Sequence, residues 1–71
     1  MTLDQLAALD LIVETGSFRA AAAQMHKAQS ALSYAIRNLE EELGFQIFSR
    51  EQYRAELTPE GRAFHSRSRR L

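Results

Sequence analysis

Residues 28–43 read AQSALSYAIRNLEEEL, and the rest of the chain is organised around this stretch. Its large apolar residues recur at steps of four, three and four positions: Leu32, Ile36, Leu39 and Leu43. This spacing predicts an amphipathic α-helix whose apolar side docks on a core. The other side carries polar side chains that can contact base edges or phosphates: Gln29, Ser30, Ser33, Tyr34 and Arg37. We therefore interpret the stretch as a DNA recognition helix whose N-terminal half enters the major groove.

The length and composition of the chain restrict its class. Its 71 residues predict one domain, and a chain this short buries only about 60% of its unfolded surface. The lack of cysteine excludes a disulfide framework and a thiolate zinc site. No run of eighteen apolar residues occurs, so no membrane-spanning helix is predicted. The first residues also lack the basic and apolar segments of a secretory signal.

The charges are segregated along the chain, although nine basic and nine acidic residues give a net charge of zero. Residues 17–39 contain three basic residues and no acid, and residues 61–71 contain four arginines and no acid. DNA responds to the charge of the face that it meets, so a neutral total is compatible with a basic binding face. The alternative is that the charges are dispersed only for solubility.

A first helix is expected near the N-terminus. Thr2 and Gln5 have the spacing of a capping box. Apolar residues follow at helical spacing and are predicted to enter the core: Leu6, Leu9, Ile12 and Val13. Gly16 is placed to end this helix as a left-handed cap residue.

A second, short helix is expected over residues 18–25, with Ser17 as its N-cap. Its middle is four consecutive alanines, which favour helix and let two helices approach closely, as a helix-turn-helix requires. His26 in the following turn is expected at the surface rather than as a metal ligand. Ala28 stands where a hydroxyl or carboxylate would cap the third helix, so either Ser30 takes that role or the first amides stay open for phosphate.

Two short extended segments are expected after Gly44, at about residues 46–49 and 55–57. Their predicted core residues are Phe45, Ile47, Phe48 and Leu57. Residues 50–54 between them are polar and predict the tip of a small β-wing.

A fourth helix is predicted to begin at Thr58 and Pro59, which suit the N-cap and first helical positions. Gly61 is expected to be a weak point just inside this helix. Phe64 and Leu71 are expected to face inward or toward a partner. The pattern is still helical where the sequence stops, which suggests that the chain belongs to something longer.

Taken together, the motifs resemble the N-terminal winged helix-turn-helix domain of LysR-type bacterial transcriptional regulators. The resemblance covers essentially the whole chain and rests on the order and spacing of many short pieces. These are Gly16-Ser17-Phe18, Ala21-Ala22, Gln29-Ser30-Ala31-Leu32-Ser33, Ile36, Leu39-Glu40, Leu43-Gly44, Phe48, Arg50, Leu57-Thr58 and Gly61. It implies a mainly α fold: a three-helix winged helix-turn-helix with a two-stranded β-wing and a C-terminal linker helix.

The resemblance also implies a domain plan and partners. Residues 1–58 would form the DNA-binding domain and residues 59–71 the start of a linker helix that pairs two chains. A C-terminal effector-binding domain, which would take a small molecule, lies outside this sequence. The expected partners are double-stranded promoter DNA and further copies of the chain, as a homodimer or homotetramer. No cofactor is expected, and the protein would be cytoplasmic and associated with the nucleoid.

By position, the resemblance implies that the third helix reads the major groove and that the wing, residues 50–54, reaches the minor groove or backbone. The residues predicted to contact DNA are Ser17, Gln29, Ser30, Ser33, Tyr34, Arg37, Arg50 and Arg54. Four positions depart from the family pattern, and they affect the expected base preference and wing contacts: Lys27, Ala28, Tyr34 and Tyr53.

Two other classes of function compete with DNA binding. A winged helix can serve as a protein-docking module, but such a module does not need the acid-free segment at residues 17–39. An enzyme would need a pocket with convergent catalytic groups. The consecutive acids Glu40, Glu41 and Glu42 diverge around a helix, and no nucleophile elbow or phosphate-binding glycine loop is present. The sequence therefore favours a DNA-binding module and not an enzyme.

Overall fold

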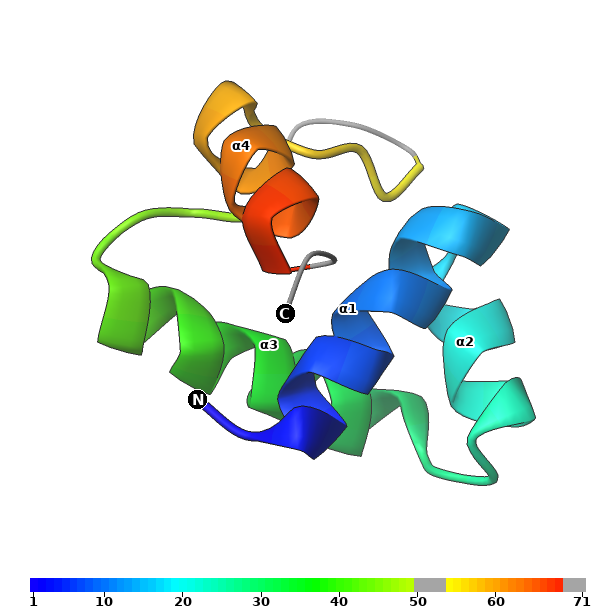
Figure 1. The fold of residues 1–71 in the computed structure, drawn as a ribbon. Coiled ribbons are helices and arrows are strands. Elements are labelled where there is room, and N and C mark those ends of the chain that lie inside the picture. Colours follow the sequence, from blue (N-terminus) through cyan, green and yellow to red (C-terminus); the bar gives the residue numbers. More distant parts are fainter. Residues whose placement is uncertain (50–53, 69–71) are drawn as a thin grey trace.

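Four helices account for most of the chain in the computed structural model, which describes residues 1–49 and 54–68. They are α1 (Leu3–Thr15), α2 (Phe18–Gln24), α3 (Gln29–Leu43) and α4 (Pro59–Ser68). Helix α1 packs against each of the other three (Figure 1). The core lies between these helices and the segment that follows α3. None of the helices in the described ranges is long and apolar enough to cross a membrane.

Helix α1 begins and ends as its local sequence predicts. The Thr2 hydroxyl accepts a hydrogen bond from the Gln5 N–H at 3.1 Å, and the Gln5 side chain accepts one from the Thr2 N–H at 2.9 Å. Gly16 adopts the left-handed conformation with φ 74°. The buried side differs from the prediction: it is centred on Leu9 and Ile12, while Leu6 and Val13 are only half-buried. The reason is that α1 contacts α2, α3 and α4, so the residues of α1 that face all three helices are the most buried.

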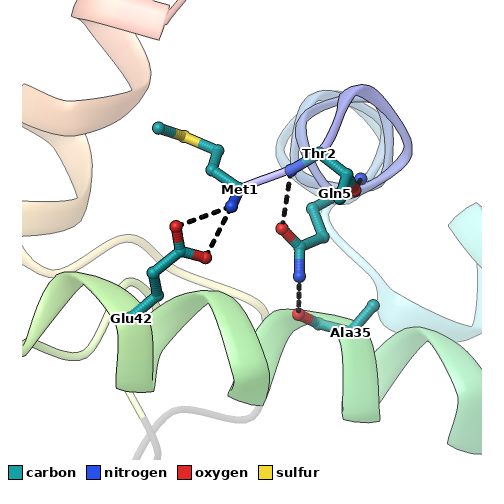
Figure 2. A network of polar contacts seen from close by, with 5 residues as sticks. All are labelled: Met1, Thr2, Gln5, Ala35 and Glu42. Carbon is teal, nitrogen blue, oxygen red and sulfur yellow. Dashed lines mark hydrogen bonds and ion pairs between the residues drawn. The ribbon is translucent and has the colours of Figure 1, made fainter.

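The start of α1 is tied to α3 by polar contacts that Figure 2 shows. The Met1 ammonium group lies 2.6 Å from both carboxylate oxygens of Glu42. The Gln5 side chain, which completes the cap of α1, also donates to the Ala35 carbonyl oxygen at 3.5 Å. These contacts are exposed or half-buried, so each contributes little to stability on its own.

Helix α2 is short and packs through its alanines, as expected. Ser17 caps it by accepting the Ala20 N–H at 3.1 Å, and Ala21 and Ala22 are buried. The helix ends in a turn in which the N–H of Lys27 donates to the Ala22 carbonyl. His26 is exposed there and has a left-handed φ of 57°, a position that usually favours glycine.

Helix α3 buries Leu32, Ile36 and Leu39, and Leu43 is half-buried at its end. The apolar stripe that the sequence predicted is therefore the docking side. The N-cap residue is Ala28, which has no side-chain hydrogen bond to the first turn. Ser30 lies inside the helix and does not act as the cap. Of the two alternatives, the structure thus has the uncapped N-terminus.

The base of the expected wing is a single antiparallel bridge between Phe48 and Leu57. The Ser49 N–H donates to the Glu56 carbonyl at 2.8 Å, and the Thr58 N–H donates to the Ile47 carbonyl at 2.9 Å. Within the described ranges, residues 46–49 and 55–57 meet only through this bridge and do not form two regular strands. Of the predicted tip, residues 50–54, all but Arg54 lie outside the part of the chain that the structure describes.

Helix α4 begins as predicted, because the Thr58 hydroxyl accepts the Gly61 N–H at 2.9 Å. The sequence predicts Gly61 only as a weak point of the helix, and the structure adds a packing reason for the glycine. Gly61 is buried, and a Cβ atom placed there would overlap the backbone carbonyl of Ile47. Glycine is therefore what allows α4 to lie on the segment after α3.

The other side chains of α4 join it to the remainder of the fold. Phe64 packs edge-to-face on Phe45 with the ring centroids 6.4 Å apart, which confirms that it faces inward. The His65 Nε2 lies 2.8 Å from an Asp10 carboxylate oxygen on α1. Leu71, the other predicted contact of this helix, is outside the described residues.

Candidate nucleic-acid interface

One side of α3 carries the polar residues that the sequence singled out. Gln29, Ser30 and Arg37 are exposed, and Tyr34 is among the most exposed large side chains, at 66%. Ser33 is half-buried because it lies at the edge of the docking side. These residues thus stay available on the surface while the opposite side of the same helix fills the core.

A shallow groove runs along α3, and we call it the α3 groove. Gln29, Ser33 and Arg37 line it from the helix, each four residues after the one before. Phe18, Phe48 and Ser49 form the opposite wall, and Ile36 and Glu40 complete the lining. Three of the predicted contact residues are therefore brought together on one surface.

A second hollow lies at the N-terminal end of α3, and we call it the end hollow. Predicted residues from three separate parts of the chain meet there: Ser17, Gln29 and Arg54. The hollow also contains Arg19, from the first turn of α2, which the sequence analysis had not assigned to the site. The position of Arg19 in the acid-free segment at residues 17–39 was a signal that it could belong to the site. Only the packing of α2 beside α3 places it in the same hollow as Arg54.

The electrostatics of the end hollow favour an anion. Arg19 and Arg54 are both exposed and supply positive charge. Helix α3 has no side-chain cap and no acid in its first turn, so the positive end of its dipole faces outward without a competing group. The Ser17 hydroxyl accepts the Ala20 N–H and retains its own proton for donation. Such a set of groups suits a phosphate oxygen.

The other predicted residues are placed differently. Ser30 and Tyr34 are exposed on α3 but line neither hollow. Arg50 lies outside the described residues, so its predicted contact stays a prediction. No group of three or more metal-ligating side chains occurs in residues 1–49 and 54–68.

Glu40 is a part of the α3 groove that sequence reasoning missed. It is buried, and its Oε2 accepts hydrogen bonds from the backbone N–H groups of Ile47 and Phe48. We had placed it with Glu41 and Glu42 as one of three splayed acids. The available signal was its spacing: Glu40 is four residues after Ile36 and three before Leu43, on the apolar side of the helix.

Comparison with known proteins identifies the family. A family model described as the bacterial regulatory helix-turn-helix protein of the lysR family matches residues 3–62. The chain belongs to the LysR family. A curated relative from Escherichia coli (strain K12), the probable HTH-type transcriptional regulator YhaJ, is 42% identical over 71 residues. That alignment covers 100% of this chain and 24% of the relative, and the chain spans 22% of another relative, YeeY from the same organism.

Solved structures agree with the LysR assignment. The DNA-binding domain in the BenM_DBD/benA site 1 DNA complex has a TM-score of 0.95 and 41% identity, covering 100% of this chain and 80% of that one. The corresponding domain in the CbnR_DBD–DNA complex has a TM-score of 0.89 and 34% identity, covering 99% of this chain and 80% of that one. The mainly helical fold of this LysR chain is therefore the fold of these domains.

Proposed function

We propose that this chain is the DNA-binding domain of a LysR-type transcriptional regulator and binds double-stranded DNA in a sequence-specific manner. The observation that carries the proposal is the exposed polar side of α3 beside the end hollow with its two arginines. The BenM and CbnR domains with this fold are described as DNA complexes, which supports the same activity here.

Base reading is assigned to the N-terminal half of α3. Gln29 lies in its first turn, where side chains of a recognition helix meet base edges. A glutamine amide can pair bidentately with adenine N6 and N7, and Ser33 lies one turn farther along the same groove. Tyr34 offers an apolar ring to a thymine methyl and a hydroxyl to a phosphate, so we expect an A·T-rich half-site under this helix.

Phosphate binding is assigned to the groups around the ends of this surface. Ser17, Arg19 and Arg54 surround the uncapped start of α3, and Arg37 lies farther along the α3 groove. Phosphate contacts fix the position of a protein on DNA and carry most of its salt-dependent affinity. The finer assignments belong to the same proposal: a two-stranded wing whose tip, residues 50–54, contacts the minor groove or the DNA backbone, with Arg50 among the contacting residues.

The rest of the protein is proposed from the same family. Helix α4 would continue as a linker helix that pairs two chains, and residues 1–58 would form the DNA-binding unit. A further domain would bind a small-molecule effector. Because the chain spans about a quarter of its curated relatives, these features are proposals for the whole protein, as are its cytoplasmic location and association with the nucleoid.

The deciding experiment is selection of bound sequences from random duplex DNA, followed by affinity measurements on single-base variants of the selected duplex. Gln29→Ala should weaken binding to the selected duplex by ~1–3 kcal/mol and binding to random DNA very little. The matched control is Arg37→Ala, which should weaken both alike and reduce the salt slope by about one unit. If Gln29→Ala weakens every duplex equally, Gln29 does not read sequence.

Tyr34 provides a second arm of this experiment. Tyr34→Arg adds a positive charge and a group that can pair bidentately with guanine. It should tighten binding to all duplexes and shift preference toward G·C at one position. If selection from random DNA enriches no sequence with the unaltered protein, specific DNA binding is wrong and a protein-docking role takes its place.

A further inference from the structure

Glu40, the buried acid of the α3 groove, carries a carboxylate within the surface that we propose binds DNA, where a negative charge would repel phosphates. Among the described residues, Glu40 is the single charged side chain that is buried, with 8% of its surface exposed. A buried carboxylate is unfavourable unless hydrogen bonds compensate for its lost hydration. Here its Oε2 accepts two backbone donors, the N–H of Ile47 at 2.8 Å and that of Phe48 at 3.3 Å.

These two donors belong to the segment that leads into the wing. Residues 47–49 pair with residues 56–58 through the Phe48–Leu57 bridge and its flanking hydrogen bonds. The consecutive N–H groups of Ile47 and Phe48 both donate to the same carboxylate oxygen of Glu40. The carboxylate thus gathers two adjacent backbone donors and connects this segment to α3.

The base of the wing has two further attachments. The Ala55 N–H donates to the carbonyl oxygen of Gly16 at 3.3 Å, between α1 and α2. The Phe48 ring packs edge-to-face on Phe18 of α2, with the centroids 5.3 Å apart. Glu40 therefore supplies a polar attachment of the base to α3 itself, and these two contacts hold the base to α1 and α2.

We propose that Glu40 is a positioning residue for DNA binding: its carboxylate holds residues 47–49 in fixed register on α3, so that α3 and residues 47–49 meet DNA as one rigid surface. The inference rests on the proposed function and deepens it. Glu40 touches no DNA in this scheme. It acts through the backbone of Ile47 and Phe48, and Ser49 beyond them lines the same α3 groove as Arg37.

Whether a Glu40 substitution strengthens or weakens DNA binding distinguishes a positioning role from a role of its negative charge alone. Loss of a negative charge near DNA should strengthen binding, because DNA is a polyanion. Loss of a positioning contact should weaken binding even though the repulsion is reduced. A purely structural role would lower the unfolding temperature and leave the affinity of the folded protein unchanged.

The test measures the affinity of the intact protein for the selected duplex and for a random duplex of the same length. Glu40→Gln removes the charge and the charge-assisted hydrogen bonds, whereas Glu40→Asp keeps the charge and withdraws the carboxylate from the amides. Both should weaken binding to the selected duplex by on the order of tenfold, comparable to the loss of one direct contact. Glu41→Gln is the control, because it removes the same charge from an exposed neighbour.

Measurements are made well below the unfolding temperature of each variant, so that the folded fraction does not change. Hydrogen exchange of the Ile47 and Phe48 amides should be faster in both Glu40 variants and unchanged in Glu41→Gln. Tighter binding by Glu40→Gln, or wild-type affinity in both variants, would overturn the positioning role alone. Absence of DNA binding by the unaltered protein would refute the proposed function and this inference with it.

Discussion

Gly61 lies where α4 meets the backbone of the segment after α3. A Cβ atom at this position would overlap the Ile47 carbonyl, whose oxygen accepts the Thr58 N–H. A shift of the Ile47 carbonyl would break its hydrogen bond to Thr58, and a shift of Gly61 would disturb the cap of α4. The residue therefore serves a close backbone approach, although glycine is unfavourable within a helix by about 1 kcal/mol relative to alanine.

The prediction is that Gly61→Ala destabilises the chain. Alanine gains about 1 kcal/mol in helix propensity, but overpacking typically costs about 1–3 kcal/mol, and the upper end applies here because the obstacle is backbone. We expect a net loss of about 2 kcal/mol, seen as a drop of about 10 °C in thermal unfolding. Ala63→Gly is the control, because Ala63 is exposed on the same helix and should lose only about 1 kcal/mol. A higher unfolding temperature for Gly61→Ala would contradict the close approach.

Helix α3 begins without a side-chain cap, and this affects both stability and binding. Ala28 has the extended backbone of an N-cap residue, with φ −69° and ψ 145°, but no oxygen to accept the first amides. A capping side chain is worth about 1 kcal/mol to a helix. Gln29, the first residue of α3, lines the end hollow with Arg19 and Arg54, where the proposed phosphate would bind.

Ala28→Asp should therefore have opposite effects on folding and on DNA binding. The carboxylate would cap α3 and raise the free energy of unfolding by about 1 kcal/mol. It would also occupy the amides and repel phosphate, so binding to any duplex should weaken. Ala28→Ser is the control: it should stabilise α3 in the same way, while its hydroxyl can still donate to a phosphate. Denaturant unfolding and titration with a random duplex measure the two effects. Unchanged DNA affinity in Ala28→Asp would mean that no phosphate binds at this end of α3.

The size of the chain limits how much DNA one copy can cover. Its principal extents are 27, 26 and 20 Å. Dimeric helix-turn-helix proteins read two half-sites about 34–36 Å apart, centre to centre. One copy therefore reaches one half-site, and two copies held at a fixed spacing are needed to read both.

We predict that the 71-residue chain alone is monomeric at micromolar concentration and protects one half-site. The described part of α4 ends at Ser68, and its one large apolar side chain, Phe64, already packs on Phe45, so the described helix offers only a thin apolar seam for pairing. Sedimentation gives the oligomeric state, and hydroxyl-radical footprinting gives the length of DNA protected. The intact protein should sediment as a dimer or larger and bind more tightly. A stable dimer of the short chain would reveal an interface within residues 1–71.

Local patterns were enough to predict the helices and the family. Capping boxes, left-handed glycines and apolar periodicity each involve residues within one or two helical turns, as at Thr2, Gly16 and the stripe of α3. The start of α4 at Thr58 was predictable for the same reason. The exposure of Gln29 and Tyr34 followed from the apolar stripe, because a helix that docks by one side presents the other.

Features that join distant parts of the chain required the packed structure. Arg19 and Arg54 meet only because α2 and the end of the wing both lie against the start of α3. The role of Gly61 depends on Ile47, 14 positions earlier. The sequence treats Glu40 as one of three divergent acids, and only the packed structure brings the backbone of Ile47 and Phe48 to its carboxylate. The physical reason is that long-range hydrogen bonds and burial depend on which segments meet in space. Helix caps and apolar periodicity depend only on residues within one segment.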